Sequence, residues 1–214
     1  MRKLIFCLAL LAASPLSAQQ DPDRAVGGGS LPAGWHARPD RADASLANVR
    51  FVPMGSGYHV TLGPAVILWR PEDAGTGEYS ARATFTQTRA PTHPEAYGLF
   101  VGGKNLEGEA DYLYFLIRGD GKYLVKHRAS DGDLHTVVNW TEHAAVRKQD
   151  AEGKATNALT VEGGDFGVRF LVNGERVAEI SRRDVPYLNT DGIVGLRVNH
   201  NLDLHVAEFA LERR

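Results

Sequence analysis

The chain has 214 residues and carries 24 lysines and arginines against 26 aspartates and glutamates, a formal net charge of −2. This near balance, without a basic cluster, argues against nucleic acid as a partner. The only cysteine, Cys7, lies in the segment described next, so the rest of the chain is expected to have no disulfide and no thiolate metal site.

The first residues are typical of a signal peptide. Arg2 and Lys3 precede an apolar run from Leu4 to Ala13, and small residues continue to Ala18. The run is too short to cross a bilayer, which needs about 20 apolar residues. We expect residues 1–18 to be removed on export to the periplasm or the exterior. The remaining 22 basic and 26 acidic residues have a net charge of −4. The sequence contains no second apolar run that would predict a membrane segment.

Residues 19–34 predict a disordered linker. The segment contains Gly27-Gly28-Gly29-Ser30 and two prolines, and it has almost no apolar side chain. Residues 35–214 show no internal repeat and no second linker, so they are expected to form one domain. A domain of this length buries about 70% of the surface of its unfolded chain.

Thirteen short runs within this domain predict strands, because they are rich in β-branched and aromatic residues. Turn sequences such as Asn173-Gly174 separate them. No stretch has a long helical period. The expected fold is therefore all-β, an antiparallel jelly-roll sandwich with little or no helix. The expected strands are residues 49–53, 58–62, 65–69, 78–86, 97–101, 111–118, 122–128, 134–139, 157–162, 166–172, 175–180, 193–199 and 204–211.

Residues 115–127, FLIRGDGKYLVKH, predict a hairpin with a three-residue loop. If Gly121 adopts the left-handed conformation, Phe115 opposes Val125 and the apolar side chains share one face. A two-residue loop would mix the faces. Arg118-Gly119-Asp120 is therefore interpreted as turn chemistry, although it also matches a cell-adhesion tripeptide.

The opposite face of this hairpin is expected to pair Tyr112 with Arg128, Tyr114 with Lys126, and Leu116 with Leu124. We expect this tyrosine-and-cation surface to be open to solvent. Aromatic rings beside hydrogen-bonding cations suit a ligand with apolar faces and hydroxyl edges, such as a sugar. A second interpretation remains open, in which the tyrosines shield the sheet and the cations extend to water.

Three segments carry a family resemblance. Phe166–Val177 reads FGVRFLVNGERV, and Asp191–Asn199 reads DGIVGLRVN before the closing strand LDLHVAEFAL. This order resembles the carboxy-terminal half of concanavalin A-like lectin/glucanase sandwiches, and is most similar to bacterial secreted 3-keto-disaccharide hydrolase-like and laminin-G-like domains. The resemblance covers roughly residues 79–211. It implies two sheets, one of them concave, with carbohydrate as the usual ligand class.

Catalytic residues are not assigned by the sequence. Glucanases of this fold place carboxylates alternately on one strand, so that two of them face the bond they cleave. The nearest match, Glu107-Gly108-Glu109-Ala110-Asp111, has the wrong order and is interpreted as a charged loop. The sequence therefore leaves open whether the protein is an enzyme.

No metal or cofactor is expected. Asp131-Gly132-Asp133 and Asn189-Thr190-Asp191 contain oxygen ligands suited to calcium but are equally good turn sequences. The eight histidines are scattered, and only Asp203 and His205 suggest a pair on one strand face.

The leading hypothesis is an exported carbohydrate-binding β-sandwich. Trp140, at the end of a strand, is either a platform at the rim of a groove or a core ring. Two alternatives stay open: a glycoside hydrolase acting on 3-keto-sugars or related saccharides, and a structural or protein-interaction domain. The residues expected to contact the saccharide are Tyr112, Tyr114, Lys126, Arg128, Trp140 and Arg197.

Overall fold

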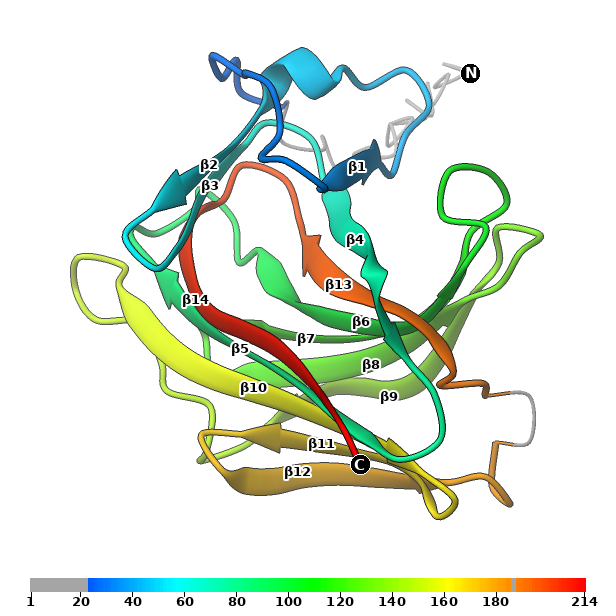
Figure 1. Ribbon diagram of the computed structural model, residues 1–214. Helices are drawn as coiled ribbons and strands as arrows, with labels where there is room; N and C mark the ends of the chain where they lie inside the picture. The colour runs from blue at the N-terminus through cyan, green and yellow to red at the C-terminus, as the bar shows by residue number, and fades with distance from the viewer. Residues whose placement is uncertain (1–22, 186–187) are drawn as a thin grey trace, which may run out of the picture.

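The structure is a computed structural model, and it describes residues 23–185 and 188–214. The expected signal peptide and the first residues of the expected linker, 19–22, lie outside the described residues. Two seven-stranded sheets stack face to face, and every paired strand runs antiparallel to its neighbour (Figure 1). The all-β prediction is confirmed.

We call the two layers sheet A and sheet B. Sheet A has the order β1 (His36–Pro39), β4 (Val66–Gly75), β13 (Gly192–Val198), β6 (Ala96–Lys104), β7 (Asp111–Arg118), β8 (Lys122–Arg128) and β9 (Leu134–Glu142). Sheet B has the order β12 (Glu175–Ser181), β11 (Gly167–Val172), β10 (Ala155–Gly164), β5 (Tyr79–Gln87), β14 (Asp203–Arg213), β3 (Gly57–Leu62) and β2 (Val49–Met54).

All thirteen predicted strands are present, with ends that differ by at most six residues. The strand that the sequence did not predict is β1, because His36-Ala37-Arg38-Pro39 has little intrinsic preference for extended structure. It forms by pairing with β4, with His36 opposite Trp69. Its edge position tolerates Pro39, which cannot donate a ladder hydrogen bond.

The hairpin of β7 and β8 has the predicted register. Phe115 opposes Val125 and Tyr112 opposes Arg128, and Gly121 has a φ of 89°. In the turn, Arg118 donates from Nε to Oδ1 of Asp120 at 2.8 Å. The adhesion-like tripeptide is therefore a turn whose two charged side chains pair with each other.

The main core lies between the sheets and is built from the inward faces of both. Phe115 is 0% exposed. Its ring centroid lies 5.0 Å from that of Phe170 on sheet B and 6.2 Å from that of Tyr123. Aromatic rings at these separations bury large apolar areas and hold the two layers together.

The described part of the expected linker, residues 23–34, contains no helix or strand. It is tied to the sandwich by Arg24, whose Nε donates to the carbonyl of Leu62 and whose backbone N–H donates to Oδ1 of Asn201, both at 2.8 Å. This segment packs on the domain although disorder was expected. It has almost no apolar side chain, and these long-range hydrogen bonds hold it in place instead.

The one helix among the described residues is the three-residue 3-10 turn Leu46–Asn48. No helix in this part of the chain is long and apolar enough to cross a membrane.

Candidate functional site

The outer face of sheet A, which points away from the main core, is concave. Arg38 on β1 and Arg128 on β8 line one crevice, together with Asp40 and Tyr112. Four strands separate β1 from β8 in the order of the sheet. Sheet A must therefore curl until its two sides approach each other across this face, as the resemblance to concanavalin A-like sandwiches implies.

A second apolar cluster covers much of this concave face. Half-buried Trp140 and Ile193 pack against it. A sheet face that carries its own apolar cluster beside charged groups differs from an ordinary solvated face, which would be more polar. The buried members of the cluster are Ile67, Trp69, Ala96, Phe100, Leu106, Ala110, Tyr112, Tyr114, Leu116 and Leu124.

Arg197 lies at the centre of the polar part of this face. Its guanidinium donates to both carboxylate oxygens of Asp40, at 2.5 Å from Nη1 to Oδ1. Nη1 also donates to the hydroxyl of Tyr112 at 3.2 Å, and the guanidinium carbon lies 4.9 Å from the ring centroid of Tyr114. Arginine suits this position because its planar fork binds a carboxylate with two bonds and also stacks on a ring.

The charge state of this cluster follows from its contacts. Burial alone would raise the pKa of Asp40, but Arg197, aided by Arg128 and Arg38, outweighs burial and lowers that pKa below its ordinary value. Burial raises the pKa of Tyr112 and of Tyr114, although Arg197 opposes the change. At neutral pH Asp40 is therefore ionised and both tyrosines keep their hydroxyl protons.

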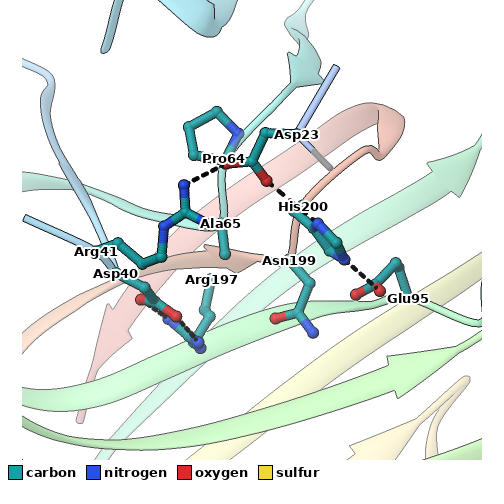
Figure 2. Close-up of a pocket in the computed structure, with 9 residues that line it drawn as sticks. All are labelled: Asp23, Asp40, Arg41, Pro64, Ala65, Glu95, Arg197, Asn199 and His200. Atoms are coloured by element: carbon teal, nitrogen blue, oxygen red, sulfur yellow. Dashed lines mark hydrogen bonds and ion pairs between the residues drawn. The ribbon is translucent and has the colours of Figure 1, made fainter. Parts of the chain in front are cut away.

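A cavity of about 290 Å³ opens beside this pair at one end of sheet A (Figure 2). Asp40 follows β1, Ala65 precedes β4, Glu95 precedes β6, and His200 follows β13. Antiparallel neighbours bring the ends of some strands to the starts of others, which is why these segments meet here. The lining residues are Asp23, Asp40, Arg41, Pro64, Ala65, Glu95, Arg197, Asn199 and His200.

His200 joins two carboxylates across this cavity. Its Nε2 lies 2.7 Å from Oε1 of Glu95, and its Nδ1 lies 3.3 Å from Oδ1 of Asp23. Asp23 also accepts a hydrogen bond from Arg41 at 3.1 Å, as Figure 2 shows. The bonds from His200 and Arg41 to Asp23 hold the segment that contains Asp23 at the rim of the cavity.

A second hollow, of about 560 Å³, lies toward the other end of β1 and β4. Trp69, Ile193 and His36 line it together with the loop between β6 and β7. Glu107 in that loop lies 3.0 Å from Nδ1 of His36. The segment that contains Glu107 and Glu109 is therefore a charged loop, as predicted, and does not present carboxylates alternately on a strand.

The structure brings five of the six predicted contact residues together. Tyr112, Tyr114, Lys126 and Arg128 share the concave face, and Arg197 joins them from β13. The expectation of an open tyrosine surface is wrong, because the two tyrosines are only 2% and 5% exposed. Neighbouring rings and the guanidinium of Arg197 pack against them. The tyrosines thus form a buried layer against which the guanidinium of Arg197 packs.

Trp140, the sixth predicted residue, is half-buried and packs against the same apolar cluster. The guanidinium of Arg118 lies 4.3 Å from the centroid of its ring. Its position is therefore on the concave face of sheet A and not in the core between the sheets. Ligand contact by Trp140 stays a prediction.

Sequence reasoning missed the charged residues that complete the site. Asp23, Arg38, Asp40, Glu95 and His200 reach the concave face or its end cavity. Arg38 and Asp40 are two positions apart, the spacing that places side chains on one face of a strand. That spacing was the only available signal, and it is weak without knowledge that β1 is a strand.

No cluster suited to a metal ion is present in residues 23–185 and 188–214. In each of the two loops considered for calcium, one side chain caps its own turn. Oδ1 of Asp131 accepts the backbone N–H of Asp133 at 3.0 Å, and Oδ1 of Asn189 accepts that of Asp191 at 2.8 Å. Both segments are ordinary side-chain-capped turns. Asp203 pairs with His59 at 3.0 Å.

Comparison with known proteins defines the fold. No family model matches the chain, and no curated protein matches it. Among solved structures, carbohydrate-binding module CBM66 from Bacillus subtilis superposes with a TM-score of 0.61 and 9% identity, covering 84% of this chain and 95% of that one. The fold is a galectin-like, or concanavalin A-like, β-sandwich.

Two further structures agree with this fold. A Bacillus subtilis protein of unknown function with a galectin-like fold has a TM-score of 0.56 and 12% identity, over 84% of this chain and 90% of that one. A putative glycosyl hydrolase from Parabacteroides distasonis has a TM-score of 0.54 and 12% identity, over 84% and 100%. At these identities the similarity establishes architecture, and function must be argued from the site.

Proposed function

We propose that this protein is an exported carbohydrate-binding β-sandwich whose ligand lies on the concave face of sheet A and enters the cavity beside Arg197. The observation that carries the proposal is the junction of that cavity with the cluster of Arg197, Asp40 and the two tyrosines. Polar groups that converge next to an apolar floor are typical of small-ligand sites.

The chemistry of the cavity suits a sugar. Each hydroxyl both donates and accepts a hydrogen bond, and the lining offers carboxylates, guanidinium groups and the amide of Asn199. A volume of about 290 Å³ is close to the lower end of the range for ligand sites, which is about 300 Å³. The cavity therefore has room for one sugar ring or the end of a chain.

The known proteins support this proposal by analogy. One structure with the same fold is named as a carbohydrate-binding module and another as a putative glycosyl hydrolase. Export remains part of the proposal and rests on the composition of residues 1–18. Amino-terminal sequencing of the exported protein tests it, since the mature chain is expected to begin after Ala18.

Replacing Asn199 by alanine is expected to weaken saccharide affinity about tenfold, the effect of losing one or two hydrogen bonds. The amide lines the cavity, so its loss leaves the sandwich intact. Binding is measured by calorimetric titration with a saccharide first selected on a glycan array. Asn139→Ala, an exposed amide on β9, is the matched control and is expected to bind normally.

A blank glycan array for the wild-type protein would contradict the proposed function. It would favour the alternative of a structural or protein-interaction domain. Equal affinity of the Asn199→Ala variant and the wild-type protein would instead keep saccharide binding but move the ligand out of this cavity.

A hydrolase acting on 3-keto-sugars or related saccharides is a second candidate, favoured by two carboxylates on one cavity. Asp40 and Glu95 both line it, and Glu95 lies 2.7 Å from His200. Such groups can donate or accept a proton at a glycosidic bond. If the candidate is correct, 3-keto-glucosides release reducing sugar and Glu95→Gln slows release at least about 100-fold. Binding without release by the wild-type protein would eliminate it.

A further inference from the structure

Around Asp40, the concave face has more positive charge than this one carboxylate can neutralise. The other two carboxylates at the end cavity, Asp23 and Glu95, are bonded to Arg41 and His200. The guanidinium groups of Arg197, Arg128 and Arg38 all lower the pKa of Asp40, whereas burial alone would raise it. Both oxygens of Asp40 are bonded to Arg197. The charges of Arg38 and Arg128 are therefore left without a carboxylate of their own in the crevice that they line.

The ion pairs of the described residues point the same way. Within residues 23–185 and 188–214, Arg38, Lys126 and Arg128 form no ion pair, although their neighbours Arg118 and Lys122 both face Asp120. Lys126 and Arg128 lie on one face of β8, two positions apart. Like charges placed side by side without a counter-charge repel one another, so an anion on this face would relieve them.

Two buried donors in this region lack a partner. The Nε–H groups of Arg128 and Arg197 are shielded from solvent, and neither donates to any described residue. Arg197 as a whole is more than nine-tenths buried, and it lines the end cavity. Buried N–H groups of charged side chains are ordinarily bonded, and an unpaired one calls for an acceptor. These unpaired donors add to the uncompensated positive charge of the face, which a ligand with negatively charged oxygens would offset.

We propose that the saccharide bound on the concave face of sheet A is acidic, and that its carboxylate or sulfate group is held by Arg128 and Arg197 with Arg38 and Lys126 nearby. This inference rests on the proposed function, because it names the ligand class of the same site. A planar carboxylate and a tetrahedral sulfate both present negatively charged oxygens that bind guanidinium groups. The structure therefore assigns the charge of the ligand, and the experiment distinguishes the two anionic groups.

Binding titrations with three classes of oligosaccharide test the inference: neutral, uronate-containing and sulfated. We expect at least one acidic class to bind about tenfold or more tightly than the neutral class. The preference is expected to shrink as salt is added, because screening weakens charge pairs at a partly exposed site. A stronger response to one acidic class identifies the anionic group.

Arg128→Gln is expected to reduce acidic affinity about tenfold and to leave neutral affinity within about twofold, since it removes one charged donor. Lys126→Gln, on the rim of the same face, is expected to reduce it less. Arg50→Gln is the matched control, because Arg50 is an exposed cation on β2 of the other sheet. Thermal melting verifies that each variant is folded.

The outcomes separate the two proposals. Neutral saccharides bound as tightly as acidic ones, or an Arg128→Gln variant with unchanged selectivity, would overturn the acidic ligand while leaving saccharide binding intact. Failure of every class to bind would overturn both. If Arg128→Gln does not fold, the salt dependence and the Lys126→Gln variant decide, and acidic binding unaffected by both would also overturn the inference.

Discussion

Replacing Asp40 by alanine is expected to lower the free energy of unfolding by about 3 kcal/mol, because it leaves the buried charge of Arg197 without its carboxylate partner. The side chain of Arg197 is only 10% exposed. Removing one partner of a fully buried pair costs about 3–5 kcal/mol. The side chain of Asp40 is 30% exposed, so water can partly replace its carboxylate and the lower end of that range applies.

Urea unfolding at neutral pH measures this effect, and Glu142→Ala is the matched control. Glu142 and Lys148 form an ion pair with side chains that are 61% and 62% exposed. Such an exposed pair contributes little to stability, because water screens it. If Asp40→Ala costs no more than this control, the buried pair does not stabilise the fold. The double variant Asp40→Ala with Arg197→Met should recover part of the loss, because no buried charge remains.

The same comparison has a pH dependence of known sign. The pKa of Asp40 is lowered in the folded protein from an unfolded value near 3.8. Its ionised form therefore stabilises the fold fully above that value, and the contribution is lost as the pH falls toward the folded pKa. The stability difference between wild type and Asp40→Ala should be constant near neutral pH and shrink below about pH 4. A difference that grows on acidification would contradict the ion pair.

Replacing Phe115 by alanine is expected to lower the free energy of unfolding by about 3–5 kcal/mol, since it opens a cavity between the two sheets. Phe115 is fully buried and packs against Phe170 across the sandwich. Removing the Phe115 ring should also weaken the contact between the two sheets. That contact holds β7 in the curvature that the concave face requires. Denaturant unfolding gives the stability, and saccharide titration of the folded fraction gives the effect on the site.

Phe166→Ala is the control for this substitution. Phe166 is half-buried beside β11, where its ring contacts the guanidinium of Arg169 at 3.9 Å from the ring centroid. Its removal exposes no core, so we expect a cost of about 1 kcal/mol. Similar losses for both variants would mean that the region around Phe115 collapses to fill the space.

The strands and the central hairpin could be predicted because their determinants are local. Alternating apolar side chains define strand faces, and a glycine at positive φ defines where the chain reverses. The pairing of Phe115 with Val125 follows from the pattern of residues 112–128 alone. The placement of Tyr112, Tyr114, Lys126 and Arg128 on one face follows from the same register.

The solvent exposure of that face could not be predicted, because it depends on what packs against it. The tyrosines were expected to be open, yet Arg197 and Phe100 contact them from neighbouring strands. Nothing in the local sequence of β7 encodes those contacts. Arg197 was selected as a site residue from its position in a resembling segment, without any indication that Asp40 is its partner.

What the sequence alone determined is the all-β class, the strand faces and the cluster of aromatic and cationic side chains on one hairpin. What only the tertiary structure decided is how the charges are paired and which are left unpaired. Asp40 and Arg197 are 157 residues apart in the chain, and they meet because β1 adds to the edge of a curled sheet. The physical reason is that side-chain alternation acts over a few residues, whereas ion pairing and burial depend on distances that only the closed sandwich defines.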